Sequence, residues 1–488
     1  MEMQRQSKAE KMILLMFMLL PTVLIPLNFD NDFWFLLNQG KYIVHNGFPT
    51  IEPFTIHPDL SFTIQQWLFD VLVYWLYTSF GKVGVMVLVF AAALVTLFLM
   101  YQLCMLLSEK KRYLSVLVTS VCYLLICIWF FVSRPQIMTY MLLLTQILCL
   151  EHYSRKRNWL FLLPLPIVSL LQINFHASMW WLLFAFMTPY LIETIRINKF
   201  SLNKEPLPKL GLYVVTGCML GAGMVNPYGH RSILYIVGAF GNDTINASIQ
   251  EMATPDIKTL TGLIYFTVLL VVVLCYVMNR KGKTKLRYTL LALGCVLLSL
   301  MSVKSIPYFL FGAVIPIAYQ LKNIAHKLRF DLGKSKLQKY GLIAFLVLIF
   351  GYANYIAVHD YDVAKDYPPG KAAIEYLKDR EKAEDVTMYT SFYDGGYAEY
   401  CGFRTYIDAR AEVFLKSTNQ KEDIFEEYMQ LQLGSLHYKD FLEKYNFTHI
   451  LVASTDTLEI FLSKDEGFSV YYEDADCKIY IPVISEGS

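Results

Sequence analysis

Residues 83–103 read VGVMVLVFAAALVTLFLMYQL, an unbroken apolar run with no charged residue. A helix that crosses a bilayer needs ~20 mostly apolar residues, so this run is long enough to span one. Runs of the same kind begin at Met12 (MILLMFMLLPTVLIPL) and at Tyr340 (YGLIAFLVLIFGYANYIAV). Because 55% of the 488 residues are hydrophobic, the sequence predicts a mainly α, polytopic membrane helix bundle.

Eleven spans are predicted before residue 359. They lie near 11–28, 82–107, 112–132, 135–152, 159–174, 178–196, 209–226, 260–279, 287–303, 305–321 and 340–358. The N-terminal segment and alternate loops hold 24 Lys and Arg residues, whereas the opposite loops hold six. Basic loops stay in the cytoplasm. We therefore expect a multi-pass plasma membrane protein with a cytoplasmic N-terminus. The net charge of +2 gives no reason to expect nucleic acid as a partner.

The chain changes character after residue 358. Residues 359–488 hold 26 acidic and 13 basic residues, and their apolar runs are short. Five runs have the composition of strands: VTMYT, RTYID, HILVA, FSVYY and KIYIP. Three segments show helical spacing: GKAAIEYLKD, KEDIFEEYMQL and YKDFLEKY. We predict a transmembrane domain over 1–358 and a small extracytoplasmic α/β domain over 359–488.

Polar residues gather at the predicted outer ends of the spans. Charged groups at that depth are costly unless they face water, a partner or a cavity. Taken singly, each is also explained as an interfacial residue, so the prediction rests on their shared location. We expect one outer cavity formed by Asp30, Asp32, Arg134, His176, Glu251 and Lys304, with Asn174 and Asn226 nearby.

The first outer loop, residues 29–81, holds two segments with helical spacing. FWFLLNQGKYIVHNG is too short to span a bilayer, and TIQQWLFDVLVYWLYTSFG is rich in aromatic residues. Both are typical of helices that lie in the membrane interface. The Pro-rich stretch GFPTIEPFTIHPDLS separates them.

Several motifs carry a resemblance, in order, along nearly the whole chain. They are DNDFWFLLNQGKYIVHNGFPTIEPFT with QQWLFDVLVYWLY, then SRPQ, NFHAS, NPYG, IQEMATP and SVKSIP, and finally DGGYAEYCGFRTYIDARAEVF. This series resembles a bacterial membrane-protein family placed with the GT-C glycosyltransferases, which are polytopic enzymes that use polyprenyl-phosphate sugars. The resemblance implies a GT-C-like bundle.

The resemblance also implies roles for particular residues. In GT-C enzymes an acidic residue just after the first span acts as base or orients the acceptor, which corresponds to Asp30 or Asp32 here. Relatives often carry His at Leu36, His-Glu-Trp at 65–67 and Arg at Lys304. His57, Gln66 and Trp67 are the substrate-contact candidates of this loop. The sequence has Gln65 and Gln66 where relatives have His and Glu, so two titratable groups of the family pattern are missing.

The chemistry of sugar transfer needs a base and cations that hold a leaving phosphate. Asp32 precedes the aromatic run and is expected to cap the next helix, which leaves Asp30 as the base. Arg134 and Lys304 are suited to the phosphate. A divalent metal stays an open alternative, with Asp30, Asp32, His57 and Glu251 as the available ligands. No spacing fixes such a site, so no cofactor is assigned.

The function we expect is transfer of a sugar from a polyprenyl-phosphate donor to an envelope glycan or protein at the outer face of the membrane. Two alternatives stay open: a transporter or flippase of a lipid-linked glycan, and a non-catalytic assembly or sensory protein. Asp408 and Arg410 are expected to form a structural pair at the end of a strand. The alternative is that DGGYAEY and YIDAR contact the acceptor or the outer cavity.

Overall fold

The computed structural model describes residues 8–195, 206–239, 249–278, 284–323 and 335–483. Parts of three predicted basic segments, at 196–205, 279–283 and 324–334, lie outside these residues. The chain forms two compact units. We call them the helical unit (Met1–Leu27, Met86–Asn226 and Ile245–Tyr361) and the mixed unit (Asn28–Val85, Pro227–Thr244 and Asp362–Ser488).

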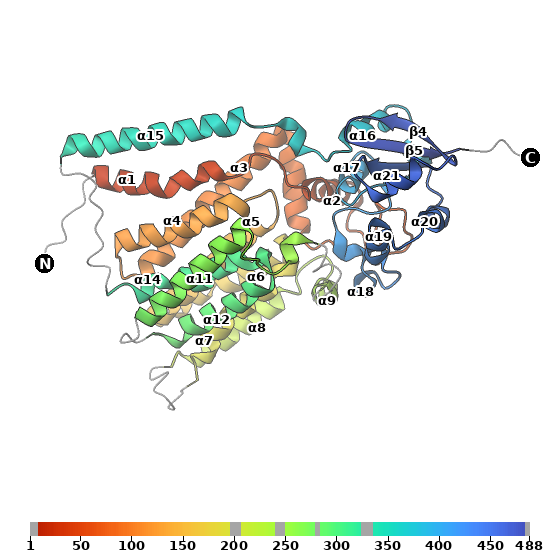
Figure 1. The fold of residues 1–488 in the computed structure, drawn as a ribbon. Coiled ribbons are helices and arrows are strands. Elements are labelled where there is room, and N and C mark those ends of the chain that lie inside the picture. Colours follow the sequence, from red (N-terminus) through yellow and green to blue (C-terminus); the bar gives the residue numbers. More distant parts are fainter. Residues whose placement is uncertain (1–7, 196–205, 240–248, 279–283, 324–334, 484–488) are drawn as a thin grey trace, which may run out of the picture. The chain divides into compact units, whose positions relative to one another are not determined.

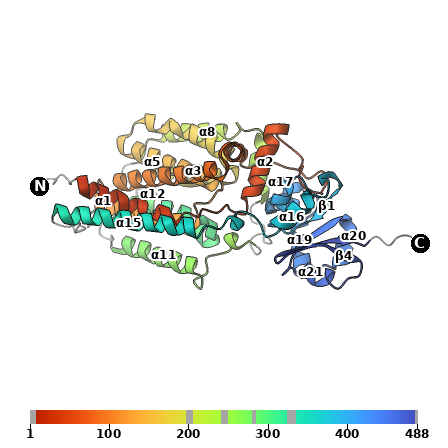
Figure 2. The ribbon, with the colours of Figure 1, turned by 90° about the horizontal axis from the view of Figure 1, so that it is seen from above.

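The helical unit has a helix or a short series of helices at each predicted span. Figures 1 and 2 show α1 and α15 side by side at one edge of the bundle. The elements are α1 (Lys8–Leu19), η1 (Leu20–Leu24), α4 (Arg112–Trp129), α5 (Gln136–Lys156), η2 (Trp159–Leu162), α6 (Pro164–Phe175), η3 (Ala177–Met179), α7 (Trp181–Ile192), α8 (Lys209–Ala222), η5 (Gln250–Met252), α11 (Leu260–Met278), α12 (Leu286–Met301), η6 (Val303–Ser305), α13 (Ile306–Phe309), η7 (Leu310–Val314), α14 (Ile317–Gln320) and α15 (Lys336–His359).

Among the described residues, four helices are long and apolar enough to cross a membrane by themselves. They are α3 (Trp67–Leu107), α4, α11 and α15. The chain is a helical membrane protein. The count of eleven spans and the orientation of the termini stay predictions.

A buried ionic cluster ties three helices of this unit together. The Arg287 guanidinium at the start of α12 donates to Glu151 of α5 at 2.7 Å and to Glu193, after α7, at 2.6 Å. Tyr190 and Tyr288 both donate to Glu151. Because a buried charge is tolerated only when it is paired and hydrogen-bonded, this cluster fixes the ends of α5, α7 and α12 against one another.

The two helices predicted in the first outer loop are both present. The first is α2 (Phe33–Asn46), and the second is the beginning of α3. Gly81 interrupts α3 with φ 59° and ψ −152°, which glycine adopts without a steric penalty. Residues 33–40 of α2 are all buried within the protein, so little of this half of the helix is exposed. That α2 and this part of α3 lie in the interface stays a prediction.

The mixed unit is built on a five-stranded sheet in the order β2-β1-β3-β5-β4. The strands are β1 (Thr387–Tyr389), β2 (Arg404–Thr405), β3 (His449–Ala453), β4 (Phe468–Glu473) and β5 (Cys477–Pro482). β1 runs parallel to β2 and β3, whereas β5 pairs antiparallel with β3 and β4. All five predicted strands are confirmed.

Helices pack around this sheet. The three predicted ones are confirmed as α16 (Lys371–Lys378), α19 (Ile424–Gln432) and α20 (Tyr438–Tyr445). The unit also contains α9 (His230–Ala239), η9 (Val363–Asp366), η10 (Ala383–Asp385), α17 (Gly395–Tyr400), η11 (Ala411–Phe414), α18 (Lys416–Asn419) and α21 (Thr457–Leu462). α16 packs on β4 and β5, α21 packs on β3, and α17 packs on α2.

The Pro-rich stretch of the first outer loop forms an isolated bridge with β2, the edge strand of the sheet. Thr55 forms a parallel bridge with Thr405, and the Ile56 amide donates to the Thr405 carbonyl at 2.9 Å. The Arg404 side chain donates to the Thr55 carbonyl at 3.0 and 2.8 Å. Residues 28–85 therefore share one unit with the tail, and the domain division at residue 358 stays a prediction.

Candidate functional site

Asp30 and Asp32 form a tight turn at the start of α2. The Asp30 carboxylate accepts a hydrogen bond from the Asp32 amide at 3.1 Å, and the Asp30 carbonyl accepts one from Phe33 at 2.9 Å. Asp32 occupies the N-cap position, but its side chain makes no capping bond, so the predicted capping role is wrong. The reason is its helical backbone (φ −73°, ψ −14°), whereas a capping side chain needs an extended one.

Aromatic rings pack the turn from both sides. Phe29 and Phe33 stack with their centroids 3.6 Å apart and their planes 9° apart. Trp34 stacks on Tyr367 and meets Tyr397 edge-on. Asp30 itself is half-buried. Its position is therefore set by the well-packed chain on either side of it.

In the helical unit, Arg134 and Glu251 form an ion pair. The guanidinium Nη1 of Arg134 donates to both carboxylate oxygens of Glu251, at 3.0 and 2.8 Å. The Glu251 segment is tied to the segment that carries Lys304, because Ser302 Oγ donates to the Glu251 carbonyl and Val303 donates to the Ala253 carbonyl.

His176 lies buried next to this region. Its Nδ1 is 2.8 Å from Thr139 Oγ1, and Gln172 donates to Thr139 Oγ1 and to the His176 carbonyl. The charge of Lys304 acts electrostatically on His176. Lys304 is half-buried, and no carboxylate among the described residues forms an ion pair with it. It is therefore a cation with capacity to bind an anion.

The two asparagines hold turns of the chain. Asn174 donates to the carbonyls of Leu170 and Val225, and Asn226 donates to the carbonyl of Gly223. Four of the six residues predicted for one cavity thus belong to the helical unit, and Asp30 and Asp32 belong to the mixed unit. Their convergence on a single cavity stays a prediction.

The remaining candidates belong to the mixed unit. His57 is buried, its Nε2 lies 2.7 Å from the Tyr406 carbonyl, and burial lowers its pKa below the ordinary 6.5. Gln66 donates to Gln39 at 3.3 Å, and Trp67 meets Phe48 edge-on. Within the described ranges, no three His, Cys, Asp or Glu side chains lie close enough together to hold a metal ion.

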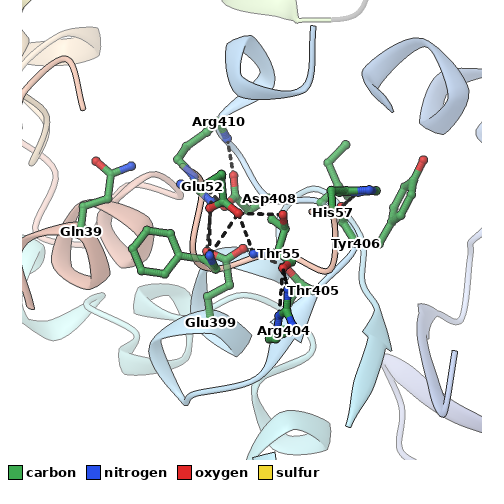
Figure 3. Close-up of polar contacts among 12 residues, drawn as sticks. Gln39, Glu52, Thr55, His57, Glu399, Arg404, Thr405, Tyr406, Asp408 and Arg410 are labelled. Atoms are coloured by element: carbon green, nitrogen blue, oxygen red, sulfur yellow. Dashed lines mark hydrogen bonds and ion pairs between the residues drawn. The ribbon is translucent and has the colours of Figure 1, made fainter. Parts of the chain in front are cut away.

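A buried cluster around Arg410 joins the first outer loop to the tail (Figure 3). Arg410 pairs with Asp408, which confirms the predicted structural pair, with Nε donating at 2.7 Å. It also pairs with Glu52 at 2.9 Å and Glu399 at 3.4 Å. Burial, and then the negative charge of Asp408, raise the pKa of Glu399 well above its ordinary value.

Glu52 and Glu399 are not among the residues predicted for a site or a structural pair. The available signal was an acidic residue inside an apolar neighbourhood: Glu52 stands between Ile51 and Pro53 in TIEPF, and Glu399 follows a tyrosine and an alanine. Such residues are buried only when they find a partner. The partner is 358 residues away in the case of Glu52, which no local pattern reveals.

Comparison with solved structures places this arrangement in a known fold. The oligosaccharyltransferase of Archaeoglobus fulgidus in its apo form aligns over 99% of this chain and 75% of its own, with 13% identity and a TM-score of 0.53. The same enzyme tethered to an acceptor peptide that contains the NVT sequon covers 96% and 74%, with 14% identity and a TM-score of 0.55. ArnT from Cupriavidus metallidurans bound to undecaprenyl phosphate covers 98% of each chain, with 9% identity and a TM-score of 0.51.

The chain has a GT-C fold. Both neighbours are GT-C glycosyltransferases, so the resemblance read from the motifs is confirmed at the level of the fold. No protein-family description matches the sequence, and no curated protein sequence matches it. In this GT-C fold, Asp30 and Asp32 lie in the segment between the first helix, α1 with η1, and α2.

Proposed function

We propose that this protein transfers a sugar from a polyprenyl-phosphate donor to an acceptor, an envelope glycan or protein, at the outer face of the membrane. The observation that carries the proposal is the carboxylate of Asp30, held in a fixed turn directly after the first helix of a GT-C fold. One neighbour binds undecaprenyl phosphate, and the other is tethered to an acceptor peptide.

Asp30 is assigned the role of general base. During transfer, the acceptor oxygen bonds to the anomeric carbon while the bond from that carbon to the phosphate oxygen breaks. The proton of the acceptor passes to the Asp30 carboxylate, and polyprenyl phosphate leaves. A carboxylate held in place by its backbone loses little entropy when it meets the acceptor, which favours this step.

Lys304 is assigned to the donor phosphate. It is half-buried and has no ion-pair partner in the described part of the chain, so it can neutralise an incoming phosphate without first giving up another partner. Arg134 already donates to both carboxylate oxygens of Glu251. It can bind the donor phosphate only if this ion pair opens, or if the phosphate binds to Arg134 while the pair stays formed. His176 contacts Thr139 in α5, the helix that begins two residues after Arg134, and its carbonyl accepts from Gln172.

The test uses purified full-length protein in lipid nanodiscs with a panel of polyprenyl-phosphate hexoses and pentoses and a mixture of envelope acceptors. Consumption of one donor with release of polyprenyl phosphate is the expected result. Asp30→Asn should abolish turnover while folding is retained, because the amide keeps the shape and cannot take a proton.

Asp59→Asn is the matched control. Asp59 is an exposed carboxylate on the same outer loop, with φ 60°, a conformation that asparagine tolerates. This variant should keep full activity. If no donor is consumed across the panel, or if Asp30→Asn turns over as fast as Asp59→Asn, the proposed function is wrong.

A further inference from the structure

Asp366 contacts the chain on both sides of the Asp30 turn. Its carboxylate Oδ1 accepts hydrogen bonds from the Phe29 amide and from Asn28 Nδ2, each at 3.0 Å. Its carbonyl accepts one from Trp34 Nε1 at 2.9 Å. The turn is therefore held just before Asp30 and just after Phe33 by one residue more than 300 positions away.

The Asp366 carboxylate is buried and forms an ion pair with Lys82. Lys82 Nζ lies 2.7 Å from Oδ1 and 2.6 Å from Oδ2, and the Asp366 side chain is 5% exposed. Lys82 follows the Gly81 kink of α3, and its ammonium group lies 5.1 Å from the centre of the Phe29 ring. The ion pair thus joins the start of the membrane helix to the turn.

Asp366 is the last residue of η9, and the N-cap of this short helix also contacts the chain before the turn. Asn28 Nδ2 also donates to the Asp362 carbonyl at 2.8 Å, and the Asp362 carboxylate caps η9 through the Ala364 amide at 3.0 Å. The carboxylate accepts from Asn28, Phe29 and Lys82, and moving it would break these charge-assisted hydrogen bonds together, so it resists displacement.

We propose that Asp366 is a positioning residue for Asp30, acting through the backbone of Phe29 and through Trp34. This proposal rests on the proposed function, since it assumes that Asp30 is the base. Asp366 touches no reacting atom. Its role is to keep the Asp30 carboxylate within the narrow geometry that proton transfer requires, with Lys82 supplying the counter-charge.

The test compares Asp366→Asn with the wild type in nanodiscs, using two independent readouts. The first is kcat and KM for the donor. Misplacing a catalytic group by about 1 Å costs up to ~100-fold in rate, so we expect kcat to fall at least ~10-fold while KM for the donor changes less than ~3-fold. The second readout, hydrogen exchange of the amides at residues 29–33, should become faster.

Lys82→Met and the double variant complete a cycle. If Asp366 and Lys82 act only through their ion pair, the double variant should lose about as much kcat as either single variant, and the two fold-decreases in kcat should not multiply. Glu10→Gln is the matched control, because Glu10 forms a partly buried ion pair with Lys339 in the helical unit. It should leave kcat and exchange at residues 29–33 unchanged.

The two readouts separate the two claims. If Asp366→Asn leaves both exchange and kcat at wild-type values, the positioning role is refuted although transfer activity stands. If exchange at residues 29–33 rises but the wild type consumes no donor, the control of the turn by Asp366 is supported and the proposed function fails. A rise in KM with unchanged kcat would assign Asp366 to binding, and would overturn the positioning role.

Discussion

Arg410 donates a hydrogen bond from Nη2 to the carboxylate of Glu52 over 2.9 Å, between side chains that are 1% and 0% exposed. The two residues lie 358 positions apart, one in the first outer loop and one after β2. Desolvating both charges is costly, so the pair is retained only because further donors and acceptors surround it. Asp408 and Glu399 supply further acceptors for Arg410, and the amides of Phe54 and Thr55 donate to Glu52.

Replacing Arg410 should unfold much of the mixed unit. Arg410→Met leaves buried carboxylates without a counter-charge, and breaking a buried pair in this way costs about 3–5 kcal/mol. Arg410→Lys should not restore stability, because an ammonium group cannot reproduce the forked contacts. Lys444→Met is the control: Lys444 pairs with Glu422 and Glu427 at a partly exposed position, where ~1 kcal/mol or less is expected. Thermal unfolding of the purified protein measures the difference.

Glu399 should make stability depend on pH. Its pKa in the folded protein is raised, first by burial and then by the charge of Asp408. The stability that the protonated carboxyl contributes is full below pH about 4.5, the ordinary Glu pKa, and is lost as pH rises through the folded pKa. Glu399→Gln keeps an acceptor for the Thr405 hydroxyl and has no ionisable group. The free energy of unfolding of this variant should therefore fall less steeply as pH rises.

The control for that pH series is Glu384→Gln, which changes an exposed glutamate of η10 in the same unit. Chemical denaturation at a series of pH values from 4 to 8 should give this variant the wild-type slope. An unchanged slope in Glu399→Gln as well would show that the carboxyl is ionised in the folded protein.

Loss of the Lys304 charge should weaken donor binding. Lys304→Gln removes a charge-assisted contact, typically ~1.5–3 kcal/mol, so KM for a polyprenyl-phosphate donor should rise at least ~10-fold. Lys258→Gln removes an exposed lysine from the same unit and should leave KM unchanged. A neutral analogue without the phosphate charge should not distinguish the two variants. Equal KM values with the charged donor would exclude Lys304 from the phosphate site.

The predicted topology has its own test. A reporter that is active only outside the cytoplasm, fused after His359, should be active, because the basic loops place the N-terminus inside. The same reporter fused in the basic loop that contains Lys110 should be inactive. Activity of a cytoplasm-only reporter after His359 would reverse the orientation.

Much of the fold follows from local patterns. Apolar runs such as 83–103 predict helices, because a chain in lipid must satisfy its backbone hydrogen bonds internally and a helix does so. The strands around Met388 and Ile450 are predicted by short runs of β-branched and aromatic residues. The capping role of Asp32 failed because the sequence shows residue preference but not backbone dihedral angles. The Asp30 carboxylate instead accepts a hydrogen bond from the Asp32 amide, within a turn whose conformation depends on its neighbours.

The sequence by itself determined the membrane bundle, the α/β character of the tail and the presence of Asp30 after the first helix, because each depends on periodicity over a few turns of chain. Only the tertiary structure decided that Glu52 pairs with Arg410, that Asp366 and Lys82 contact the chain around Asp30, and that the first outer loop bridges to β2 at the edge of the sheet. These contacts join residues hundreds of positions apart. A buried charge is stable only when it is paired and hydrogen-bonded, and its partner is whichever opposite charge the fold places beside it. A local sequence pattern does not show which residue that is.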